Sequence, residues 1–135
     1  MKITRTITAA ALASTTALAL LGVTAESASA KRPEVRASGS CSASTDWKLK
    51  AKGEDGRRLE VELEIDSNRN GQKWYLSISD NGKRVYTSSR RTHAPSGSFE
   101  VERNIANRSG YDRITANAWN SVTREKCRAV VTYRG

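Results

Sequence analysis

His93 is the only histidine in this 135-residue sequence, and it is the side chain best suited to move a proton near neutral pH. Ser96 and Ser98 follow it closely, so a serine activated by His93 and a distant carboxylate would carry out acyl transfer. No acidic residue lies close to His93 in the sequence. Because a histidine in a loop before a Pro turn is far commoner than a catalytic one, we expect no catalytic residue.

Secreted ribonucleases offer a second catalytic use of this histidine, because they combine histidine with glutamate and arginine. Here His93, Glu100 or Glu102, and Arg103 would supply those groups. The sequence motifs of these enzymes are absent. We therefore predict a protein that is not an enzyme, with a small hydrolase or ribonuclease as the least favoured alternative.

Residues 66–71 (DSNRNG) match the first half of a calcium loop, with oxygen ligands at alternate positions and a glycine for the sharp turn. The bidentate glutamate expected at the twelfth position is replaced by Ser77, and Arg69 adds a repelling charge. Zinc is disfavoured because two cysteines and one histidine supply too few soft ligands. We predict an Asn- and Gly-rich turn here, and neither metal nor cofactor.

The clearest chemical feature is a localised positive charge. The sequence contains 23 Lys and Arg against 14 Asp and Glu, a formal net charge of +9. Residues 45–66 are net acidic, whereas residues 67–135 carry the basic excess. A basic surface of this kind attracts nucleic acids and other polyanions.

Four expected strands, at 73–79, 84–90, 113–119 and 127–134, would turn cations interleaved with aromatic rings toward solvent if they share one sheet. The ligand-binding residues that we predict are Lys73, Tyr75, Arg84, Tyr86, Arg113, Asn117, Trp119, Arg128 and Arg134. Cations suit polyanions through counterion release, and rings suit stacking. The predicted function is a secreted, non-enzymatic binding module for an extracellular polyanion or glycan: a cell-wall polymer, a polysaccharide or a nucleic acid. The simpler alternative is a solvated sheet that arginines keep soluble.

A protein partner is the main alternative to a polymer. Small disulfide-stapled secreted domains often act on another protein through a loop, as inhibitors or toxin-like modules. The candidate loops are 90–98, with Arg90, Arg91 and His93, and 66–72. In either case we expect a monomer that does not insert into a membrane once an N-terminal signal peptide has been removed.

The elements that must position these residues are strands, because apolar and polar residues alternate repeatedly after residue 45 without a helical period. At 47–52 and 59–65 the alternation predicts two half-buried strands joined by a hairpin loop at 54–56. The expected register places Trp47 opposite Leu63 on the core face and lysines opposite glutamates on the solvent face.

A second hairpin is predicted around Asn81-Gly82, the strongest short hairpin signal. A two-residue turn there places Ile78 opposite Val85 on the core face. Further short alternating runs bring the total to about seven antiparallel strands. The predicted fold is therefore all-β, a small immunoglobulin-like β-sandwich with one disulfide.

The N-terminal region carries the signature of export. Residues 1–30 combine early basic residues, an apolar stretch and a small-residue cleavage site, as a secretory signal peptide does. In an oxidising compartment Cys41 and Cys127, the only two cysteines, would form a disulfide. We expect residues 31–40 to be a flexible N-terminal tail and residues 41–135 to form the domain.

Several segments of the mature chain match a known kind of exported protein. They are Cys41-Ser42, residues 46–50 (DWKLK), residues 60–62 (EVE), residues 95–99 (PSGSF) and the late Cys127. Through them the chain resembles short exported single-domain proteins of high-GC Gram-positive bacteria. The resemblance implies secretion from a bacterium and one compact β domain, and it brings no catalytic residue with it.

Overall fold

A computed structural model describes residues 33–135, so the predicted signal peptide lies outside the described residues. The described part is all β, with eight antiparallel strands in two four-stranded sheets. No helix in this part is long and apolar enough to cross a membrane. The prediction of an all-β sandwich is confirmed, with eight strands in place of about seven.

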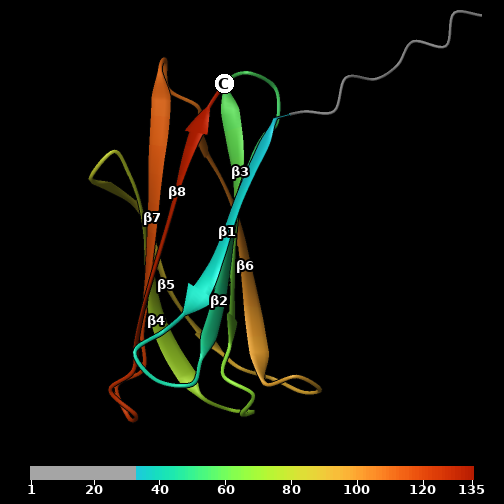
Figure 1. Ribbon diagram of the computed structural model, residues 1–135, viewed down its shortest axis with the longest axis vertical. Coiled ribbons are helices and arrows are strands. Elements are labelled where there is room, and N and C mark those ends of the chain that lie inside the picture. Colours follow the sequence, from blue (N-terminus) through green and yellow to red (C-terminus); the bar gives the residue numbers. More distant parts are fainter. Residues whose placement is uncertain (1–32) are drawn as a thin grey trace, which may run out of the picture.

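The strands are β1 (Glu34–Ser40), β2 (Asp46–Gly53), β3 (Arg58–Asp66), β4 (Lys73–Asp80), β5 (Lys83–Arg91), β6 (Ser98–Ala106), β7 (Tyr111–Trp119) and β8 (Lys126–Arg134). The first sheet has the order β1-β2-β3-β6 and the second has the order β5-β4-β7-β8. Figure 1 shows the two sheets packed against each other, with β8 running beside β1 along one edge. Since β4 and β7 are the central strands of the second sheet, their outward side chains share its middle.

The core lies between the sheets and is built from the alternating apolar residues of both. In β3 every second residue from Leu59 to Ile65 is buried, while the glutamates between them face outward. Trp74 on β4 is the largest fully buried side chain. Burying each large apolar side chain stabilises the fold by about 1.5–3 kcal/mol. Because alternation places these side chains on one face of each strand, the strand conformation lets them all be buried together.

Cys41 and Cys127 form the predicted disulfide across a sequence separation of 86 residues. It joins the turn before β2 to β8, and the Ser42 N–H of the same turn donates a hydrogen bond to the Lys126 carbonyl at 2.8 Å. The first and last parts of the domain are therefore tied together, and β8 packs against both β1 and β2.

The first hairpin keeps the predicted faces but differs in register. Trp47 lies opposite Ile65 rather than Leu63, and the Lys–Glu partners shift in the same way. The cause is the turn, where Asp55 accepts hydrogen bonds at 3.0 Å from the two backbone N–H groups that follow Gly56. Because the slip is two residues, every side chain stays on its predicted face.

The second hairpin has the predicted two-residue turn, since Asp80 pairs with Lys83. Beyond the turn the register shifts: Ile78 lies opposite Tyr86, and Val85 is the extra residue of a β-bulge. The expected pairing of Ile78 with Val85 is therefore wrong. A bulge adds one residue to one strand, so it reverses the face of every residue beyond it.

The flexible tail expected before residue 41 is also wrong, because Glu34–Ser40 form β1 and pair with β2 along their whole length. Gly39 indicates a loop in the sequence, yet in the strand it makes room for an aromatic ring. A Cβ at Gly39 would lie 2.7 Å from the ring of Trp47. The inward residues of β1 are Val35, Ala37 and Gly39, so the alternation is present, but only Val35 is a large apolar residue and the pattern is weak.

Candidate functional site

The outward face of the β5-β4-β7-β8 sheet brings together most of the predicted site. Alternation along β4, β7 and β8 buries one set of residues and leaves the other set toward solvent. Arg84 joins this face because it lies opposite Ser79, an outward residue of β4. The predicted residues found here are Lys73, Tyr75, Arg84, Arg113, Asn117, Trp119, Arg128 and Arg134.

Two further cations lie on the same face. Lys126 lies opposite Trp119, and Arg91 lies opposite Lys73. Lys126 extends the outward series of β8 by one position, so alternation could have found it, whereas Arg91 is turned outward by the bulge. We call the whole surface the basic face; its members are Lys73, Tyr75, Arg84, Arg91, Arg113, Asn117, Trp119, Lys126, Arg128 and Arg134.

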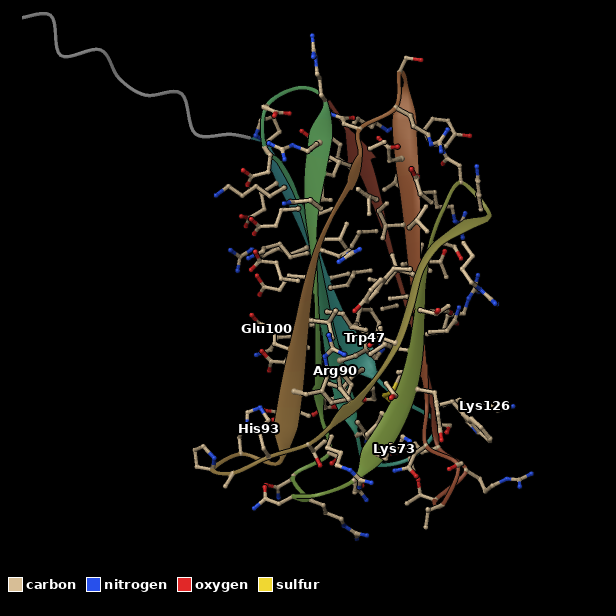
Figure 2. All side chains as sticks on the ribbon, turned by 180° about the vertical axis from the view of Figure 1, so that it is seen from behind. Trp47, Lys73, Arg90, His93, Glu100 and Lys126 are labelled. Carbon is tan, nitrogen blue, oxygen red and sulfur yellow. A yellow bond between two sulfur atoms is a disulfide. The ribbon has the colours of Figure 1, made fainter. Side chains whose placement is uncertain are left out.

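Tyr86 is the predicted member that does not belong to the basic face. It lies opposite Ile78 and is partly buried against the core. The Arg103 guanidinium of β6 lies 4.7 Å from the centre of its ring, and Arg90 Nη2 donates a hydrogen bond to its hydroxyl at 3.2 Å. A hydrogen bond with Ser88, followed by the charge of Arg90, lowers the pKa of Tyr86. Figure 2 shows Arg90 between β5 and β6, so this group covers the edge of the sandwich.

The basic face carries no carboxylate. The acidic residues after residue 66 lie elsewhere: Asp80, Asp112 and Glu125 are buried, and Glu100 and Glu102 are on β6 in the other sheet. No ion pair within residues 33–135 involves a cation of the basic face. Its positive charge is therefore balanced by solvent counterions, which a polyanion would release on binding.

Tyr75 and Trp119 form an exposed aromatic pair across the two central strands of this sheet. They lie directly opposite each other, with ring centres 6.0 Å apart and ring planes tilted by 35°. Their side chains are 42% and 38% exposed, respectively. Lys73 Nζ lies 5.1 Å from the centre of the Tyr75 ring. Both rings thus remain available for stacking, beside a cation.

Shallow hollows flank Trp119 on the basic face. One of about 210 Å³ lies between Tyr75 and Trp119 and is bordered by Arg84 and Asn117. The other, of about 550 Å³, is formed by Trp119, Arg124 and Lys126. Each hollow combines an aromatic ring with cationic groups.

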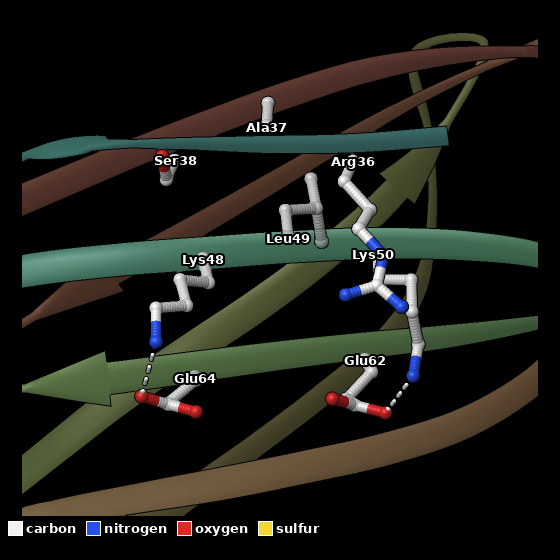
Figure 3. Close-up of a pocket in the computed structure, with 8 residues that line it drawn as sticks. All are labelled: Arg36, Ala37, Ser38, Lys48, Leu49, Lys50, Glu62 and Glu64. Carbon is white, nitrogen blue, oxygen red and sulfur yellow. Dashed lines mark ion pairs between the residues drawn. The ribbon is translucent and has the colours of Figure 1, made fainter. Parts of the chain in front are cut away.

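The outward face of the other sheet is charged but compensates its own charge. Lys50 Nζ lies 2.5 Å from Glu62 Oε2, and Lys48 Nζ lies 3.5 Å from Glu64 Oε1. These pairs line a hollow of about 270 Å³ that also includes Arg36 (Figure 3). Because Lys48 and Lys50 are both paired with carboxylates, much of the positive charge of this face is already compensated, unlike that of the basic face.

Carboxylates crowd where β3 meets β6. Oxygen atoms of Glu60, Glu62 and Glu102 lie within 4.8 Å of one another. Partial burial raises the pKa of Glu60, and the charge of Glu102 adds to the rise. Lys50 contacts Glu62 and supplies a compensating cation, so a bound metal is not needed to explain the cluster.

The catalytic alternatives are not assembled in the described part of the chain. The Nδ1 atom of the exposed His93 contacts the Ala94 carbonyl at 3.2 Å, and the described hydrogen bonds and ion pairs join His93 to no carboxylate. The hydroxyls of Ser96 and Ser98 bond to each other at 2.6 Å. Glu100 projects outward from β6 (Figure 2), whereas the Arg103 guanidinium lies over the Tyr86 ring, so the ribonuclease set is not brought together either.

Residues 66–71 form the predicted turn. Asp66 Oδ1 accepts a hydrogen bond from the Asn68 N–H at 3.0 Å, and both Asn68 and Gly71 have positive φ. The Arg69 carbonyl accepts hydrogen bonds from Ser67 and Thr92. An Asp66 carboxylate oxygen and the Arg69 carbonyl thus help to hold the turn.

Comparisons with known proteins leave the function open. No protein-family model matches the sequence, and no curated protein matches it. Among solved structures, the chain is similar to chicken MD-1 complexed with lipid IVa, at 12% sequence identity and a TM-score of 0.32. The match covers 77% of this chain and 99% of the MD-1 chain. A likeness this distant identifies neither a family nor a ligand, so function must be inferred from the basic face itself.

Proposed function

We propose that this protein is a secreted, non-enzymatic binding module of a bacterium, and that the basic face binds an extracellular polyanion. The observation that supports this most strongly is that every charged side chain of the face is a cation without a carboxylate partner. Each anionic group that it contacts releases a counterion, and this release drives binding. The disulfide between Cys41 and Cys127 suits an oxidising, extracellular compartment.

A polyanion fits the basic face better than a neutral glycan does. Sugar hydroxyls donate hydrogen bonds as well as accept them, and carboxylates are the side chains that accept most strongly. The basic face offers donors from Arg and Lys but no carboxylate. Stacking of a neutral sugar on Tyr75 and Trp119 would leave the surrounding cations without a role.

The strand order supports an immunoglobulin-like arrangement as part of this proposal. In such domains the chain crosses several times between two antiparallel sheets, with Greek-key connections. Here β2, β3 and β6 would form one sheet of that plan and β5-β4-β7-β8 the other, with β1 as an added edge strand. This arrangement leaves the basic face as a broad, uncovered sheet surface.

The alternative of a loop that binds a protein has less support. Arg90 bonds to the Tyr86 hydroxyl, and Arg91 Nη1 donates to the Gly71 carbonyl at 3.1 Å. Two of the three side chains named for that loop are thus engaged within the fold. Exchange of Arg90, Arg91 and His93 for Ala without loss of binding to a captured partner would remove this alternative.

The proposed function can be tested with inorganic polyphosphate as the probe, titrated at 50 and 200 mM salt. About five anion contacts would weaken binding roughly 100-fold over this range. A variant with Arg84→Gln, Arg113→Gln and Arg128→Gln should lose at least tenfold in affinity at low salt.

A matched control removes the same charge from the other sheet, through Arg36→Gln, Lys48→Gln and Lys52→Gln. This control should change the affinity by less than about threefold, because its cations are distant from the basic face or already paired. Equal losses in the two variants would show that only bulk charge matters, and the proposal would then be wrong.

A further inference from the structure

The aromatic pair on the basic face is not explained by polyanion binding alone. Tyr75 and Trp119 lie on the two central strands of a four-stranded antiparallel sheet, opposite each other and exposed. A polymer that carries only anionic groups has no flat π surface and gains nothing from these rings. Nucleobases gain from them, because stacking on an aromatic side chain is favourable for every base.

Each of the two rings has a cation beside it. Lys73 lies over Tyr75, and Lys126 on β8 lies opposite Trp119. Figure 2 shows Lys73 and Lys126 at the same end of the molecule, where β4 begins and β8 begins. Arg84 borders the hollow between the rings. A base on either ring would thus have its phosphate within reach of a cation.

The hollow between the rings also offers neutral hydrogen-bonding groups. Ser77 and Asn117 lie opposite each other and line it together with Tyr75 and Trp119. An amide both donates and accepts, so Asn117 matches the mixed donors and acceptors of a base edge. A phosphate polymer without bases would use only the donor half of that amide.

We infer that the ligand of the basic face is a single-stranded nucleic acid, with bases stacked on Tyr75 and Trp119 and phosphates held by the surrounding lysines and arginines. This inference rests on the proposed function and narrows it to one class of polyanion. Aromatic side chains on the central strands of an open four-stranded sheet are a recurring way to hold unpaired bases. A duplex is disfavoured because its bases are stacked inside the helix and cannot reach the rings.

The inference predicts a difference between two probes of similar charge, oligothymidine and inorganic polyphosphate. Wild-type protein should bind both, and oligothymidine should in addition quench the emission of Trp119. Of the other two tryptophans, Trp74 is fully buried and Trp47 is partly buried, so they form a steady background. Polyphosphate should leave the emission nearly unchanged.

Substitution of the rings separates stacking from charge. Trp119→Ala and Tyr75→Ala should each weaken oligothymidine binding about tenfold. The affinity ratio between oligothymidine and polyphosphate should fall by the same factor, and Trp119→Phe should restore most of it. Circular dichroism and the thermal midpoint show whether each variant is folded, and the wild-type quenching does not depend on any variant.

The outcomes distinguish the inference from the proposal beneath it. If both probes bind, but the ring substitutions do not change their ratio, the inference is wrong and the proposed function stands. Equal affinity for a DNA duplex and for oligothymidine, without quenching, would also overturn the inference. If neither probe binds at low salt, the inference and the proposed function are both wrong.

Discussion

A buried pair of carboxyl groups should make the stability of the fold depend on pH. Asp80, at the end of β4, and Asp112, near the start of β7, are 2% and 0% exposed. Arg108 Nε donates to Asp80 Oδ2 at 3.3 Å, and the Arg108 backbone N–H donates to the Asp112 carboxylate. Ionising both carboxyl groups of this close, buried pair is unfavourable. We therefore expect the pair to retain one proton at pH values above those at which a carboxyl group usually loses it.

The magnitude follows from the pKa. Burial raises the pKa of Asp80 from 3.8 to about 6, with the hydrogen bond and charge of Asp112 adding to the rise and Arg108 opposing it. A difference of about 2 pKa units corresponds to about 3 kcal/mol. Because the folded state holds the proton more tightly, this stabilisation is fully present below about pH 4 and is lost as the pH rises through about 6.

The perturbation is Asp80→Asn, which mimics the protonated carboxyl at all pH values. Urea unfolding should be followed by tryptophan fluorescence between pH 4 and pH 7. The difference in unfolding free energy between variant and wild type should shift by about 2–3 kcal/mol in favour of the variant across this range. At pH 4 the two proteins should be similar, because both then carry a neutral group at residue 80.

The control is Asp46→Asn, which removes an exposed carboxylate from β2. Its pH profile should run parallel to that of the wild type. If the Asp80→Asn profile also runs parallel, the pair does not share a proton, and the reasoning about its burial fails.

The disulfide, the glycine of β1 and the salt dependence of binding can each be tested. Reduction of the Cys41–Cys127 disulfide should lower the unfolding free energy by about 4–5 kcal/mol, because it opens a long loop in the unfolded chain. Urea unfolding with and without reductant measures this change. A loss below about 2 kcal/mol would contradict the prediction. Gly39→Ala should destabilise the folded protein by about 1–3 kcal/mol, since the new methyl group meets the Trp47 ring. Thermal melting is the assay, and an unchanged midpoint would show that β1 moves aside freely. Binding of oligothymidine should weaken roughly 100-fold between 50 and 200 mM salt if about five phosphates are contacted; a flat salt dependence would exclude phosphate contacts.

Much of the basic face could be predicted from the sequence because alternation is a local property. Successive side chains of a strand point to opposite faces, so Lys73, Tyr75 and Trp119 are directed outward once their strands are recognised. Tyr86 is the exception, because the bulge at Val85 leaves no mark in residue type or spacing. Residue type does not reveal the bulge either, because the polar residues at this edge of the sheet would suit either face.

The strand at Glu34–Ser40 is hard to predict from sequence for a different reason. Of its inward residues only Val35 is large, and Gly39 is there because the Trp47 ring covers it. That contact arises only when β1 pairs with β2, so a glycine that favours a loop in isolation is required in the strand.

By itself the sequence determined the class of fold, the disulfide partners and the side of each regular strand, because alternation and the presence of two cysteines need no knowledge of distant contacts. The tertiary structure alone decided which strands share a sheet. Pairing of β4 with β7 makes Tyr75 and Trp119 neighbours and places Asp80 near Asp112 in a buried site. These contacts join residues far apart in the chain, and burial in a common core, rather than any local preference, selects them.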